Sequence, residues 1–300
     1  MLIQWYPGHM HKACKDIKQA LPDIDLLIEV LDARIPYSSQ NPMLAALRGS
    51  KPTIRALNKT DLADPDITSE WREFLEQEQS VKTLAISSSQ PEKAKQIIEL
   101  CGKMLPEKVA ANKVIRTMIM GIPNVGKSTI INILAGRVIA KTGNEPAVTK
   151  QQQRIDLKNN IVLSDTPGVL WPNVENRNSG YRLAVTGAIK DTVFQHDDIA
   201  LFAAEYLLEC YPELLQKRYR FEVLPTEATQ LLEMIGEKRG CLKRGKQVDM
   251  DKAAKLFLTE FRAGTLGRIS LERPENIVVE MMQLQVIREA KAAKKTSGKR

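Results

Sequence analysis

Short, nearly continuous apolar runs alternate with helical segments over roughly the first 170 residues of the chain. Apolar residues at successive positions are typical of strands that are buried on both faces of a sheet. The strands expected from this pattern are residues 25–31, 53–57, 81–86 and 114–120, with 161–163 as a shorter fifth. Because strands that alternate with helices form parallel sheets, the pattern predicts an α/β fold with a mainly parallel sheet covered by helices.

The pattern changes after Trp171, where strand-like runs become rare. Asp197 and Asp249 are suitable N-caps for two of the helices that follow, and Gly240 and Gly264 stand where helices are expected to end. The expected helices are residues 197–211, 226–238 and 249–262. This part of the chain is therefore predicted to be all-helical.

The last residues, 286–300, lose apolar periodicity and carry six basic residues against one acidic residue. Such a composition is typical of a disordered segment. The sequence thus divides into an α/β domain over 1–178, a smaller helical domain over 179–285 and a basic disordered tail over 286–300.

Composition narrows the class of protein. The chain has 300 residues and 43% of them are hydrophobic, which is enough to build packed cores and excludes global disorder. The net charge of +8 suggests a polyanionic partner. The chain does not start with a basic segment followed by an apolar core, and no apolar run approaches the roughly 18 residues of a membrane span. We therefore expect a cytoplasmic protein with no membrane partner.

Residues 121–128 read Gly-Ile-Pro-Asn-Val-Gly-Lys-Ser and fit the pattern G-x-x-x-x-G-K-[ST]. They follow an expected strand and open an expected helix over 129–134, which is the context that a phosphate-binding loop requires. The loop amides and the helix N-terminus can hold phosphates, Lys127 can reach the terminal phosphates, and the Ser128 hydroxyl can ligate Mg²⁺. The expected nucleotide contacts are Asn124, Val125, Gly126, Lys127, Ser128 and Thr129.

Asp165-Thr-Pro-Gly168 follows the fifth expected strand. The Asp165 carboxylate can hold Mg²⁺ through water, and the Gly168 amide can meet the γ-phosphate of a nucleotide. Alone the tetrapeptide fits an ordinary turn, but downstream of a phosphate loop it indicates a nucleotide sensor. Thr149, in the polar loop between the two motifs, is expected to complete the Mg²⁺ ligands, with Thr142 as the alternative.

Asn58, Lys59, Thr60 and Asp61 close the second expected strand. A carboxylate such as that of Asp61 accepts hydrogen bonds from the ring N–H and the exocyclic amine of guanine, a pattern that adenine does not offer. Lys59 can lie along the base plane. Asn and Asp after a strand are also common turn formers, but together with the two phosphate motifs the tetrapeptide predicts guanine specificity, so GTP and GDP are the expected ligands.

Ser87 and Ser88, at the end of the third expected strand, can place backbone amides against the guanine carbonyl oxygen, and an ordinary Ser-rich turn is the alternative. The order of the motifs is unusual, because the base-reading tetrapeptide precedes the phosphate loop along the chain. Every motif still follows a strand, so the same sheet can form with shifted termini and bind its ligand at the carboxyl ends of the strands. The sequence therefore predicts a circularly permuted P-loop GTPase domain followed by a helical domain.

The chain resembles the YlqF family, ribosome biogenesis GTPase A, in this motif order and in several local sequences. These are WYPGHM near the start, DARIP at Asp32–Pro36, the phosphate loop, DTPGVLWP and GEKRGCL. The resemblance covers nearly the whole chain and implies a circularly permuted GTPase that acts in late assembly of the large ribosomal subunit, with a helical domain that contacts ribosomal RNA. Ala147 differs from the glycine that the family usually carries there.

Val169 stands where many GTPases carry the glutamine that orients the attacking water, a task that an aliphatic side chain cannot perform. The resemblance implies that His9 positions or activates this water. A structural histidine that caps the first helix is the alternative. Asn124 resembles the asparagine that ligates K⁺ in cation-dependent GTPases, and its alternative role is to stabilise the turn of the phosphate loop.

A basic loop between two expected helices contains Lys238, Arg239, Lys243, Arg244 and Lys246 without an intervening acidic residue. Basic loops with glycines can approach a phosphate backbone closely, although such runs are often simply solvated. The resemblance favours RNA contact.

The motifs predict a monomeric GTPase with a slow intrinsic rate. The resemblance implies that it binds the precursor of the large ribosomal subunit and uses GTP hydrolysis as a timer. An RNA-binding assembly module that holds GTP as a structural ligand is the first alternative. A P-loop kinase is a second, which the guanine-reading motif and the lack of an evident acceptor-binding lid disfavour.

Overall fold

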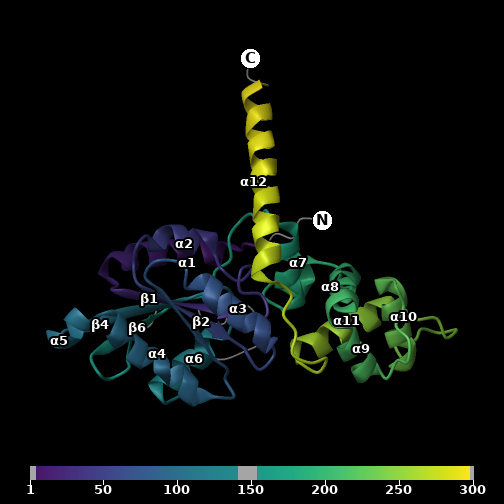
Figure 1. The fold of residues 1–300 in the computed structure, drawn as a ribbon, viewed down its shortest axis with the longest axis horizontal. Coiled ribbons are helices and arrows are strands. Elements are labelled where there is room, and N and C mark those ends of the chain that lie inside the picture. Colours follow the sequence, from purple (N-terminus) through teal and green to yellow (C-terminus); the bar gives the residue numbers. More distant parts are fainter. Residues whose placement is uncertain (1–4, 141–153, 298–300) are drawn as a thin grey trace.

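The computed structural model describes residues 5–140 and 154–297 and contains a six-stranded sheet with a helical part beside it (Figure 1). The strand order is β3-β2-β1-β4-β6-β5, and all neighbours are parallel except β5 and β6. The strands are β1 Leu26–Asp32, β2 Thr53–Asn58, β3 Val81–Ala85, β4 Ile115–Met120, β5 Arg154–Asp156 and β6 Ile161–Asp165. The five predicted strands are thus confirmed.

Every residue of β1 and β2 is buried, as expected for central strands with near-continuous apolar sequences. The antiparallel edge strand β5 was missed because it has three residues, of which only the middle one is buried. So short an alternation carries no clear signal.

Helices cover both sides of the sheet. In Figure 1, α1 and α2 lie above it and α4 and α6 below it. The helices of this part are α1 Gly8–Ala20, α2 Pro42–Arg48, α3 Pro65–Leu75, α4 Pro91–Met104, α5 Pro106–Ala110 and α6 Lys127–Ala135. Four of them begin with proline, whose missing N–H and fixed φ suit the first helical position.

The second part is helical, as the sequence indicates. Its helices are α7 Arg177–Val185, α8 His196–Cys210, α9 Pro212–Tyr219, α10 Ala228–Lys238, α11 Met250–Arg262 and α12 Pro274–Ser297. Helix α8 packs against α7, α9, α10 and α11. Because α7 begins at Arg177, the predicted domain boundary at 178 falls inside a helix.

Two details of the helical prediction are wrong. The N-cap of α8 is Gln195, and Asp197 lies in the first helical turn, where a carboxylate still interacts favourably with the helix dipole. Helix α12 extends to Ser297 and so includes most of the segment expected to be disordered. That segment is rich in Ala, Lys, Glu and Arg, which are strong helix formers even where no apolar stripe is present.

Three other predictions for the helices are confirmed. The Asp249 side chain accepts a hydrogen bond from the Lys252 amide and caps α11. Gly240 and Gly264 follow the C-caps of α10 and α11 with φ of 69° and 71°, a left-handed conformation that glycine adopts without strain.

The segment between α11 and α12 packs back onto the sheet part. The Leu271 amide donates to the Arg34 carbonyl at 2.8 Å, and the Trp71 indole donates to the Glu272 carbonyl at 2.9 Å. The fully buried Glu272 carboxylate accepts hydrogen bonds from the amide and the hydroxyl of Ser38. These contacts join residues far apart in the sequence and fix the helical part against the sheet.

Candidate functional site

The phosphate loop links β4 to α6 and has the predicted strand-to-helix context. Gly126 has φ of 94°, and a Cβ atom there would lie 2.2 Å from the Asn58 side-chain nitrogen. The first helical hydrogen bond runs from the Ile130 amide to the Gly126 carbonyl. The amides of Lys127, Ser128 and Thr129 therefore precede the helical ladder and suit an anion at the helix N-terminus.

Lys127 is buried and its ammonium group donates to the carbonyls of Gly121 at 3.0 Å and Ile122 at 2.8 Å. Burial lowers the pKa of Lys127, and the nearby Asp165 carboxylate opposes this shift. Burial in turn raises the pKa of Asp165 against the opposing charge of Lys127. The Lys127 side chain thus lies inside the loop that would carry the terminal phosphates.

Asp165 fits the predicted magnesium site. Its Oδ1 atom is buried and has no hydrogen-bond partner among the residues that the structure describes. Burying a carboxylate oxygen without a hydrogen-bond partner costs free energy, and Mg²⁺ with its waters would supply the missing partner. Ser128, at the start of α6, is the second described residue of the expected ligand set.

Gly168 lies directly against the phosphate loop. A Cβ atom at this position would come within 2.9 Å of the Pro123 backbone and 3.1 Å of the Lys127 ammonium nitrogen. The Thr166 hydroxyl donates to the Ile119 carbonyl at 2.7 Å and holds the segment on β4. Asp165 and Gly168 therefore meet the phosphate loop where the γ-phosphate of a nucleotide is expected.

The residues after Gly168 form hydrogen bonds with three separate segments of the chain. The Val169 amide donates to the Gly121 carbonyl at 3.3 Å, and the Val169 carbonyl accepts from the Asn41 side chain at 2.8 Å. The Leu170 amide donates to the Met10 sulfur at 3.4 Å. Val169 is fully buried, so its side chain does not reach water in this arrangement.

The base-reading turn is connected to the phosphate loop through Asn58, whose side-chain amide donates to the Val125 carbonyl at 2.7 Å. Thr60 bonds through both its amide and its hydroxyl to the Ile86 carbonyl. The Ser87 hydroxyl donates to Asp61 at 2.6 Å. The structure therefore brings the two predicted base-reading segments together at the ends of β2 and β3.

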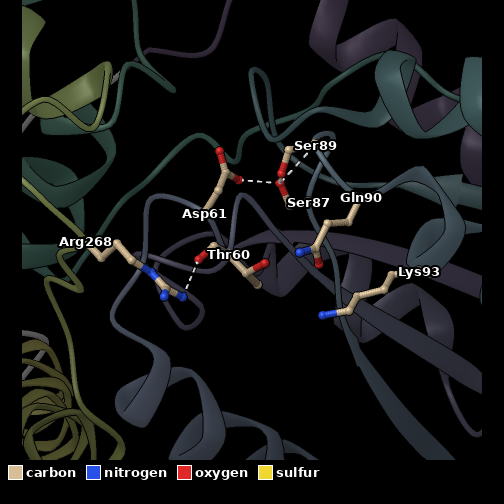
Figure 2. Close-up of a pocket in the computed structure, with 7 residues that line it drawn as sticks. All are labelled: Thr60, Asp61, Ser87, Ser89, Gln90, Lys93 and Arg268. Carbon is tan, nitrogen blue, oxygen red and sulfur yellow. Dashed lines mark hydrogen bonds between the residues drawn. The ribbon is translucent and has the colours of Figure 1, made fainter.

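A pocket of about 350 Å³ lies beside these two segments (Figure 2). Figure 2 shows the Asp61 and Ser87 side chains facing each other, with Arg268 on one side of the pocket and Lys93 on the other. Its lining residues are Thr60, Asp61, Ser87, Ser89, Gln90, Lys93 and Arg268. Ser88 is exposed in the turn and is not among them.

The sequence analysis missed two groups that support the base-reading turn. The Asp32 carboxylate, at the end of β1, accepts from Lys59 at 2.9 Å and from two nitrogens of Arg34 at 2.9 and 2.7 Å. Burial opposes the ionised form of Asp32, but the two cations outweigh it and hold the pKa of the carboxyl well below its usual range. Arg268 donates to the carbonyls of Thr60 and Ala63, both at 3.0 Å.

A signal was present for Asp32, because it directly follows the predicted strand 25–31 and so lies at the same sheet edge as the other motifs. For Arg268 there was none, because the residue belongs to the distant segment after α11.

His9 is exposed in the first turn of α1. The helix has Pro7 as its N-cap and no side-chain cap, so the alternative role of His9 as a capping residue is wrong. The next residue, Met10, contacts the segment after Gly168. Thr149, its alternative Thr142 and the neighbouring Ala147 lie outside the described residues.

The predicted basic loop lies at the far end of the helical part, between α10 and α11. Lys243, Arg244 and Lys246 are exposed on a tight hairpin that the bridge between Leu242 and Val248 closes. Lys238 and Arg239, at the end of α10, are exposed but contact α9 and α11. All five basic residues are therefore exposed at this end of the helical part, remote from the nucleotide site (Figure 1).

Together, the phosphate loop, the Asp165–Gly168 segment and the Asn58–Asp61 turn define a P-loop GTPase. The turn comes from β2 and the loop from β4, on opposite sides of β1 in one parallel sheet, although the turn comes first in the chain. This is the circularly permuted arrangement that the motif order predicts.

Comparison with known proteins shows which family this chain belongs to. A family model described as 50S ribosome-binding GTPase matches residues 116–219. The chain is 45% identical over 282 residues to ribosome biogenesis GTPase A of Priestia megaterium, covering 91% of this chain and 98% of that protein. It is 33% identical to the Thermotoga maritima protein of the same name over 92% of this chain and 96% of that one. The chain belongs to the ribosome biogenesis GTPase A family.

Solved structures agree with this assignment. The GNP-bound YlqF from T. maritima superposes with a TM-score of 0.62 at 30% identity and covers 88% of this chain and 99% of that one. A GDP-bound YlqF structure gives a TM-score of 0.64 over 87% and 99% of the two chains. Among the described residues, none of the helices is both long and apolar enough to span a membrane.

Proposed function

We propose that this GTPase binds the precursor of the large ribosomal subunit in its GTP form and leaves it after hydrolysis, so that the nucleotide acts as a timer in late assembly. The observation that carries the proposal is the contact of Gly168 with the phosphate loop, at the start of the segment that leads into α7. A γ-phosphate at this contact changes the environment of the chain that enters the helical part. The names of the relatives supply the ribosomal context.

Two further contacts support communication between the nucleotide site and the helical part. The Asn124 side chain of the phosphate loop donates to the Gly187 carbonyl, just after α7, at 2.7 Å. Arg262 of α11 donates to the carbonyls of Ala184 and Val185 at the end of the same helix. A shift of the phosphate loop is therefore transmitted to α7 and from there to α11.

In the proposed reaction, water attacks the γ-phosphate in line with the leaving GDP. Ser128, Thr149 and, through water, Asp165 would hold Mg²⁺, which would neutralise charge on the phosphates. Lys127 contributes positive charge at the same place. Since Val169 is buried and aliphatic, another group, a bound ion or a partner must orient the water.

We assign the orientation of the water to His9. It is exposed in the first turn of α1, and the next residue, Met10, contacts the segment after Gly168, so His9 belongs to an element that packs beside this segment. The variant His9→Ala is expected to lose most of the partner-stimulated rate and to keep its GTP affinity. An unchanged stimulated rate would contradict the assignment.

Asn124 is also the proposed K⁺ ligand. It adopts a left-handed conformation in the loop, with φ of 61°, and its side-chain nitrogen is held by the Gly187 carbonyl, so the amide oxygen is the atom that would ligate the ion. A monovalent cation beside the phosphates would add positive charge where the transition state needs it. Hydrolysis should then be faster in K⁺ than in Na⁺ at matched ionic strength, and equal rates would refute the ion site.

The helical part is the proposed RNA-binding element, through Lys238, Arg239, Lys243, Arg244 and Lys246. We further propose that the protein works as a monomer in the cytoplasm. The direct test is co-sedimentation with large ribosomal subunits in the presence of GDP or of a nonhydrolysable GTP analogue. Retention with the analogue and release with GDP are expected, whereas association that does not depend on the nucleotide would overturn the timer.

A second candidate is an RNA-binding assembly module in which GTP is a structural ligand. The buried Val169 favours it, because this chain lacks the usual water-orienting side chain. Phosphate release that large subunits accelerate would exclude this candidate.

A further inference from the structure

A second pocket lies in the helical part, between the ends of α9 and α10, and has a volume of about 230 Å³. Its lining residues are Arg218, Tyr219, Arg220, Lys238 and Arg239, so four of its five side chains are cationic. Two of these cations, Arg218 and Arg220, do not belong to the basic run that the sequence singles out.

The backbone at the end of α9 builds one side of this pocket. Arg220 has φ of 54°, a left-handed conformation that ends the helix and turns its carbonyl toward α10. The Lys238 ammonium group donates to this carbonyl at 2.8 Å and lies 5.0 Å from the centre of the Phe221 ring. These two contacts fix the position of the Lys238 charge at the pocket.

On the other side of the pocket, a single carboxylate holds two guanidinium groups in place. Glu260 of α11 pairs with Arg218 at 2.5 Å and with Arg239 at 3.1 Å, and it accepts a hydrogen bond from the Tyr219 hydroxyl at 2.8 Å. The Arg239 guanidinium also lies over the Tyr219 ring, 5.6 Å from its centre. Glu260 therefore orients two guanidinium groups, so little side-chain entropy remains to be lost when an anion binds.

The charges around the pocket are not balanced. Of the four cations, Arg218 and Arg239 pair with Glu260, and neither Arg220 nor Lys238 forms an ion pair among the described residues. Like charges held close together repel one another, and an anion bound at the pocket would relieve this repulsion. The excess positive charge indicates that the ligand is an anion.

We propose that this pocket binds a phosphate group of the RNA backbone. The proposal rests on the proposed function and adds a defined phosphate site to the basic loop. Oriented guanidinium groups form short, charge-assisted hydrogen bonds to phosphate oxygens, and the Lys238 ammonium group adds a further donor. The exposed hairpin with Lys243, Arg244 and Lys246 follows directly from Lys238 and Arg239, so neighbouring phosphates of the same strand can lie along it.

The test uses the full chain and ribosomal RNA extracted from large subunits and freed of protein. Arg220→Asn removes one charge and keeps a residue that tolerates the left-handed conformation. Lys238→Met removes another and keeps the contact with the Phe221 ring. The control is Lys95→Met on α4, which removes one charge from a side chain on the sheet part that is 53% exposed and pairs at the surface with Glu92 at 3.5 Å.

Each pocket variant should raise the dissociation constant for this RNA about fivefold or more. It should also make the salt dependence less steep by about 0.7 to 0.9 in the slope of log K against log salt concentration, the contribution of one lost phosphate contact. The control should match the wild type in both measurements, and all variants should keep the wild-type GDP affinity.

Pocket variants that match Lys95→Met in affinity and slope would overturn the phosphate site. This outcome differs from failure of the timer, which is decided by nucleotide-dependent association of the unmodified protein with whole subunits.

Discussion

The contact between Gly126 and Asn58 yields a quantitative prediction about how the base-reading turn and the phosphate loop hold each other. In Gly126→Ala the new methyl group meets the Asn58 side-chain nitrogen at 2.2 Å, and the residue must keep φ of 94°. The side chain of Asn58 must move, so its buried hydrogen bond to the Val125 carbonyl is lost.

The two costs can be separated. An alanine in a left-handed conformation costs about 1–2 kcal/mol. A buried carbonyl left without its partner costs about 1–3 kcal/mol. Gly126→Ala should therefore lower the free energy of unfolding by about 2–5 kcal/mol, and Asn58→Ala, which loses only the hydrogen bond, by about 1–3 kcal/mol.

The double variant distinguishes this explanation from two independent defects. With Asn58 already shortened to alanine, the clash disappears and the hydrogen bond cannot be lost twice. The double variant should therefore be destabilised by about 1–3 kcal/mol less than the sum of the two single variants.

The assay is urea unfolding of the nucleotide-free protein, followed by the fluorescence of tryptophan, which includes the fully buried Trp71 of the sheet part. Circular dichroism on the same samples shows whether one transition describes the data. Effects that add to within about 0.5 kcal/mol would refute the shared contact.

Three more predictions follow from single contacts. Val169→Gln should leave the intrinsic hydrolysis rate unimproved and lower the free energy of unfolding by about 1–3 kcal/mol, because the site is fully buried; a faster phosphate release would contradict this. Arg268→Met removes two hydrogen bonds to the base-reading turn and should raise the dissociation constant for GDP about 5- to 30-fold, as measured with a fluorescent nucleotide. The rate of GTP hydrolysis at saturating GTP should not change. Burial raises the pKa of Glu272 to about 7, so the folded state holds this proton when the unfolded state has lost it, and stability falls as the pH rises from about 5 to 7. Glu272→Gln removes this contribution, and its urea midpoint should fall less than that of the wild type over the same range.

The sequence predicts the nucleotide site well because its parts are local. Asn58, Gly126 and Asp165 each belong to a short motif that follows a strand, and the carboxyl ends of parallel strands meet at one edge of the sheet. Once the strands were predicted, the spatial neighbourhood of the motifs followed, and the structure confirms it for the residues it describes.

The supporting contacts could not be predicted in the same way. Arg268 reaches the carbonyl of Thr60 and Glu272 reaches Ser38 across most of the chain, and neither pair leaves a periodic or motif signal. The same reason explains the basic pocket. Lys238 reaches the Arg220 carbonyl only because α9 ends in a left-handed turn beside α10. That placement depends on tertiary packing.

Helix α12 shows a different limit. The sequence loses its apolar stripe after about residue 286, and an apolar stripe is the main signal for a helix that packs on a core. The helix continues because its residues favour helix formation without that packing. Apolar periodicity therefore predicts that the helix ends here, whereas residue propensity predicts that it continues.

The central claim is that GTP hydrolysis by this protein is tied to the large ribosomal subunit, and the most direct measurement is the rate of phosphate release from GTP with and without purified large subunits. Small subunits at the same concentration are the control for RNA in general. The account predicts a slow rate alone and an acceleration on the order of tenfold or more by large subunits only. Equal rates in the presence and absence of large subunits would contradict it.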